Sequence, residues 1–237
     1  MLPDYAELHC LSNFSFLRGA SHPDELVEQA VAQGYAALAL TDECSLAGIV
    51  RAHQAARQAG LKLLVGSEMT TLDGLKLVFL AQNREGYGNL SALITLARRR
   101  ADKGHYSLHR HDLNAVSPNG ALPDCLVLWV PGEGQGADEG RWLAERFPGR
   151  LWIAAELHAG PDDIAVRELR AGLRQVRFGM PLLHELARRA LRIVQVAEHA
   201  RDLGHVRRQI GEKVHDLGVI FLLADDPGDQ AFGIQVM

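Results

Sequence analysis

Residues 36–69 read AALALTDECSLAGIVRAHQAARQAGLKLLVGSEM, and this stretch decides the fold. It begins with an unbroken apolar run at 36–40, as expected for a strand that is buried on both faces of a sheet. Ser45 is placed to cap a helix whose apolar residues recur at helical spacing, and Gly60 is placed to end it. A second apolar run follows at 61–65. Strand, helix and strand in this order predict a parallel pair with a right-handed crossover.

The same alternation continues on both sides of this unit. A short strand is expected at 5–8, and a helix is expected to run from its cap at Ser21 to Gly34. Beyond the unit, the turn sequence LDGL leads into a strand at 76–80, and a further helix is expected at 89–100. We therefore predict an α/β fold with a parallel sheet, because strands that alternate with helices pair in parallel. Several such units in series can close into a barrel.

Farther along the chain the pattern repeats and then changes. Strands are expected at 126–130 and 151–155, and helices at 139–147 and 162–173. From about residue 181, helical segments follow one another without a strand between them. They lie at 182–203 and 205–217, before a last strand at 219–224. We expect one α/β domain over residues 1–180 and a helical C-terminal segment over residues 181–237.

Composition and charge exclude several classes of protein. The formal net charge is −4 and the sequence pI is about 6.2, which argues against a strongly basic nucleic-acid surface over the whole chain. The three cysteines form no CxxC pair, so a zinc ribbon and a disulfide framework are not expected. A reducing cytoplasm fits this pattern. The sequence begins without a secretory signal and holds no run of about 18 apolar residues, so we expect no membrane segment.

Three acidic or imidazole side chains follow successive predicted strands. His9, Asp42 and Glu68 each stand where a strand gives way to a loop. Since the carboxyl ends of parallel strands meet at one edge of a sheet, we expect these three residues to share that rim. Imidazole and carboxylate groups are ligands for Zn²⁺ or Mn²⁺, and two or three such ions would activate water and polarise a phosphoester. The sequence therefore predicts a candidate metal site.

Each of these residues also has a structural interpretation. His9 could be a hydrogen-bonded residue of the core, Asp42 could cap the following helix, and Glu68 could be solvated in its loop. The polar stretch 101–122 holds three further histidines that could supply a ligand. They are His105, His109 and His111. We identify no nucleic-acid-binding residues from the sequence alone.

Four segments of the chain resemble successive motifs of a known family. They are residues 5–21 (YAELHCLSNFSFLRGAS), 39–50 (ALTDECSLAGIV), 64–69 (LVGSEM) and 83–90 (NREGYGNL). They resemble the PHP (polymerase and histidinol phosphatase) domain of bacterial C-family DNA polymerases, the DNA polymerase III alpha-like proteins, and above all its error-prone members. The resemblance is dense over residues 5–100 and looser to about residue 170.

This resemblance implies a distorted (β/α) barrel whose open rim binds metal ions and, in the wider family, hydrolyses phosphoesters. By the same resemblance, Glu43 joins His9, Asp42 and Glu68 as a candidate ligand of Zn²⁺ or Mn²⁺. Error-prone members of the family take part in translesion synthesis after DNA damage. The resemblance thus implies DNA, a polymerase core and mutasome proteins as partners, with Mg²⁺ needed only by a polymerase core that this chain lacks.

The sequence departs from the active family pattern in three places. Active members open with His-x-His, but Leu11 follows His9 here. They usually carry Asp-His in the second motif, where this chain has Glu43 after Asp42. A late Asp-x-His motif is missing near residue 170, which implies a PHP-like domain over 1–180 that lacks its last metal-motif strand. The expected metal site is therefore a degenerate one, and we assign no catalytic residue.

Three functions compete at this stage. The first is a structural PHP domain, a fragment of an error-prone DNA polymerase that cannot polymerise by itself. The second is an active metal-dependent phosphoesterase or 3′–5′ exonuclease. The third is a protein-binding module that uses the helices over 182–217 to bind mutasome proteins. Whether the chain is an enzyme is left open by these alternatives, because three or four candidate ligands are few for a multinuclear metal site.

Overall fold

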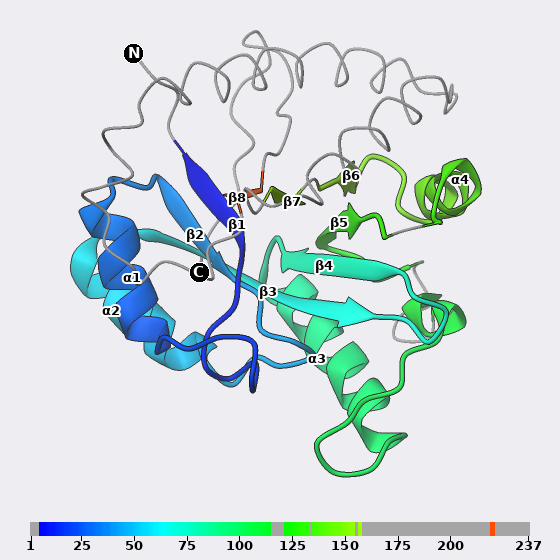
Figure 1. Cartoon of the computed structure of the whole chain (residues 1–237), viewed down its shortest axis with the longest axis horizontal. Helices are drawn as coiled ribbons and strands as arrows, with labels where there is room; N and C mark the ends of the chain where they lie inside the picture. The colour runs from blue at the N-terminus through cyan, green and yellow to red at the C-terminus, as the bar shows by residue number, and fades with distance from the viewer. Residues whose placement is uncertain (1–4, 115–120, 133, 155, 158–218, 221–237) are drawn as a thin grey trace, which may run out of the picture.

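The computed structural model describes residues 5–114, 121–132, 134–154, 156–157 and 219–220 (Figure 1). Its main feature is a six-stranded sheet in the order β1-β2-β3-β4-β5-β6. The strands are β1 (Ala6–Cys10), β2 (Ala37–Leu40), β3 (Lys62–Thr70), β4 (Lys76–Ala81), β5 (Cys125–Val130) and β6 (Leu151–Ile153). A short antiparallel pair, β7 (Glu156–Leu157) and β8 (Val219–Ile220), lies beside β1.

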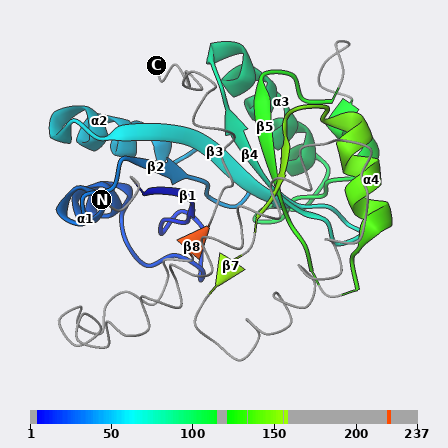
Figure 2. The ribbon, with the colours of Figure 1, turned by 90° about the horizontal axis from the view of Figure 1, so that it is seen from above.

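Four helices and one 3-10 turn connect the strands. They are α1 (Pro23–Ala32), α2 (Ile49–Ala59), α3 (Arg84–Arg99), the turn η1 (Arg110–Asn114) and α4 (Ala137–Arg146). Helices α1 and α2 pack on each other and on the half of the sheet that holds β2 and β3, and α3 packs against β3, β4 and β5. Figure 2 shows the two groups of helices at opposite ends of the curled sheet. None of the helices in the described ranges is long and apolar enough to cross a membrane.

The α/β class is confirmed, but the prediction of a fully parallel sheet is wrong. Pairs β1–β2, β2–β3 and β5–β6 are parallel, whereas β4 runs antiparallel to both β3 and β5. The chain has only residues 71–75 between β3 and β4, too few for a crossover, so these strands form a hairpin. The result is a curled, mixed sheet with β1 and β6 at its ends within the described residues, an incomplete α/β barrel.

Several predicted boundaries shift for local reasons. Helix α3 begins at Arg84 rather than 89, because Asn83 caps it by accepting a hydrogen bond from the Gly86 N–H. Helix α2 begins at Ile49, and Ser45 instead accepts the Ala47 N–H in the preceding turn. Residues 219–220 form a strand, as expected at the start of 219–224. The helices expected at 162–173, 182–203 and 205–217 lie outside the described residues.

The core lies between α3 and the antiparallel half of the sheet. Leu90, Leu93 and Ala97 recur on one face of α3 and are fully buried. They pack in one cluster with Phe79 of β4 and Trp129 of β5, which are among the largest fully buried side chains. A second cluster joins α1 and α2 to β2. These two clusters hold β1, β2 and β3 in register and so position the polar side chains on and after these strands.

Two glycines of α3 give a matched test of this packing. A Cβ atom at Gly86 would lie 2.0 Å from the carbonyl oxygen of Asp124, whereas one at Gly88 would meet nothing within 4 Å. Gly86→Ala should therefore lower the free energy of unfolding by about 1–3 kcal/mol. Gly88→Ala should raise it by roughly 0.5–1 kcal/mol through helix propensity. Urea unfolding of both variants checks this, and equal effects would contradict the packing described here.

Candidate functional site

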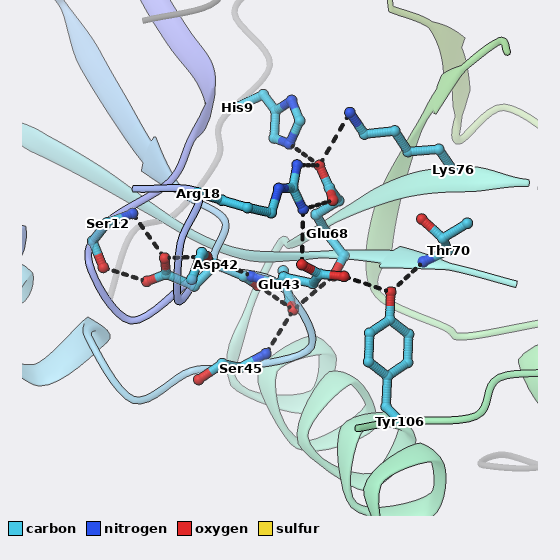
Figure 3. A network of polar contacts seen from close by, with 12 residues as sticks. His9, Ser12, Arg18, Asp42, Glu43, Ser45, Glu68, Thr70, Lys76 and Tyr106 are labelled. Atoms are coloured by element: carbon cyan, nitrogen blue, oxygen red, sulfur yellow. Dashed lines mark hydrogen bonds and ion pairs between the residues drawn. The ribbon is translucent and has the colours of Figure 1, made fainter. Parts of the chain in front are cut away.

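The candidate residues come from the first three strands. His9 lies in β1, Asp42 and Glu43 follow β2, and Glu68 lies inside β3 rather than in the loop after it. The segment after β2 continues alongside β3. The Cys44 N–H donates to the Glu68 carbonyl, and the Glu68 N–H donates to the Thr41 carbonyl. This pairing brings Glu43 beside Glu68. Figure 3 shows the resulting network of polar side chains.

Glu68 is a buried carboxylate surrounded by cationic or hydrogen-bonding side chains. It is 1% exposed, and its oxygens lie 2.7 Å from His9 Nε2, 2.5 Å from Arg18 Nη1 and 3.3 Å from Lys76 Nζ. Burial by itself would raise the pKa of Glu68, but hydrogen bonds from His9 and Arg18 and the charge of Lys76 outweigh it. The pKa of Glu68 is therefore held well below its usual range, and the group is a carboxylate at neutral pH.

Arg18 is the residue that sequence reasoning missed. Its guanidinium donates to Glu68 through two nitrogens and to Glu43 Oε2 at 2.9 Å, so one cation joins two carboxylates. These bonds hold the pKa of Arg18 above its usual range. The signal in the sequence is a single arginine in the loop after β1, nine residues beyond His9.

Within the described ranges, Asp42 is bound by neutral hydrogen-bond donors and not by cations. It accepts hydrogen bonds of 2.7 Å from the Ser12 N–H, the Ser12 hydroxyl and the Ser15 hydroxyl. Both serines belong to the loop between β1 and α1, so Asp42 ties that loop to the end of β2. The alternative that Asp42 caps the following helix is wrong, because α2 begins after Gly48 and Asp42 accepts from the loop between β1 and α1 instead. Both oxygens of Asp42 are engaged within the protein.

Glu43 is held on its other side by Tyr106 and Arg98. Tyr106 donates from its hydroxyl to Glu43 Oε1 at 3.1 Å, and burial raises the pKa of Tyr106 to about 12. Arg98 donates to the backbone carbonyls of Glu43 and Cys44, and also to those of Gly104 and His105. Arg98 thus fastens the stretch after α3 to the segment after β2.

The side chains of the three histidines in the polar stretch have no contact with Glu43 or Glu68 among the interactions of the described residues. The rings of His109 and His111 stack with centroids 5.1 Å apart, and His111 faces Asp112 rather than Glu68. His105 takes part through its backbone carbonyl, which accepts from Arg98. Over the described part of the chain, no three or more His, Cys, Asp or Glu side chains are grouped so that they could hold a metal ion.

Comparison with known proteins identifies the family. The family model described as "PHP domain" matches residues 7–127, just over half of the chain. The chain therefore belongs to the PHP domain family. This agrees with the four sequence segments that resemble PHP-domain motifs and with the incomplete α/β barrel of the structure.

The curated relatives are longer proteins. The error-prone DNA polymerase of Dechloromonas aromatica is 67% identical in an alignment of 205 residues that covers 83% of this chain and 20% of that protein. The error-prone DNA polymerase of Azoarcus sp. (strain BH72) is 50% identical in an alignment of 220 residues that covers 80% of this chain and 21% of that protein. The chain thus spans about a fifth of the length of these relatives.

Solved structures are more distant. An amidohydrolase from Chromobacterium violaceum, solved with bound sulfate and no metal, is 17% identical at a TM-score of 0.47, covering 70% of this chain and 82% of that one. A two-domain protein from Bacteroides vulgatus that contains a predicted PHP-like metal-dependent phosphoesterase is 15% identical at a TM-score of 0.39, covering 71% of this chain and 44% of that one.

A double-mutant cycle measures the central ion pair. Arg18→Ala leaves Glu68 with fewer charge partners, so it should lower the free energy of unfolding by roughly 1–3 kcal/mol, less than for a fully buried pair because Arg18 is partly exposed. The same substitution should cost clearly less in a Glu68→Gln background. Urea unfolding at pH 7 gives the four values. Equal costs in both backgrounds would show that the pair is not coupled.

The low pKa of Glu68 also predicts a pH dependence. An acid whose pKa is depressed in the folded protein stabilises it above the pKa of the unfolded chain, about 4.5, and this contribution is lost as the pH falls below that value. Wild-type stability should therefore fall more steeply below pH 4.5 than that of Glu68→Gln. Glu28→Gln, at an exposed position of α1, is the control and should keep the wild-type slope. Identical slopes for all three proteins would refute the assignment.

Proposed function

We propose that this chain is the N-terminal PHP domain of an error-prone C-family DNA polymerase and that its rim has a structural rather than a hydrolytic role. The identity to two error-prone polymerases over four fifths of the chain supports the parent protein. The observation that carries the structural role is the placement of Arg18 between Glu43 and Glu68. The parent would act in translesion synthesis and DNA repair, with DNA, the polymerase core and mutasome proteins as its partners.

The residues at the rim do not fit the metal ions that the family implies. A divalent cation bound by Glu43 and Glu68 would have to lie beside the guanidinium of Arg18, and Lys76 adds a second positive charge to Glu68. Like charges at such distances repel strongly in a partly buried site. Asp42 already accepts three hydrogen bonds, and Leu11 offers no ligand atom. Arg18 and Lys76 therefore already supply the positive charge that balances Glu43 and Glu68. These residues leave no place for a metal ion that would activate water for hydrolysis.

The rival phosphoesterase function would need Zn²⁺ or Mn²⁺ at these same residues, and nothing in their geometry favours it. The third function, a protein-binding module, depends on helices expected over 182–217, which lie outside the described residues.

We propose further that the PHP-like domain extends over residues 1–180 and that 181–237 forms a separate segment. The three cysteines are free and buried, which fits a protein of the reducing cytoplasm.

Metal analysis tests the structural role. Purified chain should carry no stoichiometric zinc or manganese, its melting temperature should not change with EDTA or Mn²⁺, and it should not hydrolyse bis(p-nitrophenyl) phosphate. In an Arg18→Ala/Lys76→Ala variant the two cations are gone, so Mn²⁺ should raise the melting temperature of that variant and not of the wild type. Stoichiometric metal in the wild type, together with hydrolysis that EDTA abolishes, would overturn this proposal.

A chimaeric polymerase tests the parent assignment. In the Dechloromonas aromatica polymerase, the segment that matches this chain is replaced by the corresponding residues of this chain. Because the two are 67% identical there, the chimaera should fold and extend a primer at a rate close to that of the unmodified enzyme. A soluble, folded chimaera without primer extension would count against the assignment.

A further inference from the structure

The loop between β1 and α1 presents apolar side chains to solvent. Phe16 is 84% exposed and Leu17 is 89% exposed, and Phe14 beside them is 41% exposed. No other large hydrophobic residue that the structure describes reaches the exposure of the first two. We call Phe14, Phe16 and Leu17 the loop tip. Two adjacent side chains of this size in water are an unfavourable arrangement unless a partner covers them.

The residues on both sides of the loop tip are bound to carboxylates on and after the strands of the sheet. Ser12 and Ser15 are bound to Asp42, and Arg18 is bound to Glu43 and Glu68. Within the loop, the N–H groups of Arg18 and Gly19 donate to the Ser15 carbonyl at 2.9 and 3.0 Å. Phe16 and Leu17 therefore lie between two anchored positions, one on each side of them in the sequence. The contacts of Ser15 and Arg18 restrain the backbone on both sides of Phe16 and Leu17.

The backbone at Leu17 supports this view. Its φ is +62°, in the left-handed region that a leucine rarely adopts and a glycine would adopt freely. The anchors at Ser15 and Arg18 hold Leu17 in this conformation, with its side chain directed outward. Such conformations persist where the surrounding contacts determine them, and they gather at ligand-binding and switch segments.

The chemistry of the loop tip defines the kind of partner. The serine hydroxyls and the guanidinium nearby are engaged with carboxylates of the same chain, so the tip offers apolar surface rather than free polar groups. Nucleic acid would require cations available to its phosphates, and Arg18 is already paired with two carboxylates. The complementary surface is therefore an apolar pocket on a folded protein.

We propose that the loop tip is the point at which this domain docks into an apolar pocket of the polymerase core, the remaining four fifths of the longer polypeptide. This inference rests on the proposed function. The relatives that match this chain are about five times as long as the matched part, so most of their chain lies outside it. An anchored apolar projection of this kind is suited to filling an apolar pocket at such an interface.

The chimaeric polymerase described above provides the test. A Phe16→Ser/Leu17→Ser variant is made both in the isolated chain and in the chimaera. Val50→Ser is the matched control, because Val50 is 66% exposed on α2 and belongs to none of the contacts described here. Calorimetry gives the melting temperature of this domain in each protein, and analytical ultracentrifugation gives the state of association of the isolated chain.

In the wild-type chimaera we expect this domain to melt at a higher temperature than in the isolated chain. The loop-tip variant should abolish that increase and leave the isolated chain unchanged, and Val50→Ser should change neither. The proposal is overturned if the loop-tip variant keeps the increase, or if it destabilises the isolated chain equally, which would show local packing. It is also overturned if the variant instead breaks a dimer of the isolated chain, since the partner is then a second copy.

Primer extension separates this inference from the proposed function. A wild-type chimaera that is folded but inactive contradicts the parent assignment, whatever the loop-tip variant does. A chimaera that is active and indifferent to Phe16→Ser/Leu17→Ser contradicts only the docking point.

Discussion

The ion pair between Arg18 and Glu68 is the interaction on which the rest of the rim depends. Glu68 is almost completely buried in β3, and a buried carboxylate is strongly unfavourable unless opposite charge and hydrogen bonds compensate for its lost hydration. Arg18 supplies both, and it can do so only while the loop after β1 lies over the strand ends. The position of the loop and the charge state of Glu68 are therefore determined together.

The three carboxylates near this rim are stabilised by different means. Glu68 relies on cations and His9, Glu43 shares the guanidinium of Arg18 and the hydroxyl of Tyr106, and Asp42 relies on neutral donors from the loop. In a metal-binding member of the family, metal ions would supply this positive charge. Here side chains of the same chain supply it, and Asp42, Glu43 and Glu68 are bound to the loop after β1.

The reversal of β4 contributes directly to this arrangement. Glu68 pairs with Val78 across the hairpin, and Lys76 lies two residues from Val78 on the same face of β4. Diagonal neighbours of this kind are within reach of a long side chain. A parallel fourth strand would not have set Lys76 against Glu68 in this register. The short turn between the strands thus adds the second cation near the carboxylate.

The sequence by itself determined the α/β class, the order of the first elements and the gathering of His9, Asp42 and Glu68 near one rim. It could do so because apolar runs, helical spacing and the parallel arrangement of β1, β2 and β3 are local or nearly local properties. It also carried the family, through motifs that are contiguous in the chain. Only the tertiary structure decided what these residues do. The antiparallel hairpin, the path of the loop, and the meeting of Arg18 with residues 25 and 50 positions away depend on long-range packing, and no periodicity records those contacts.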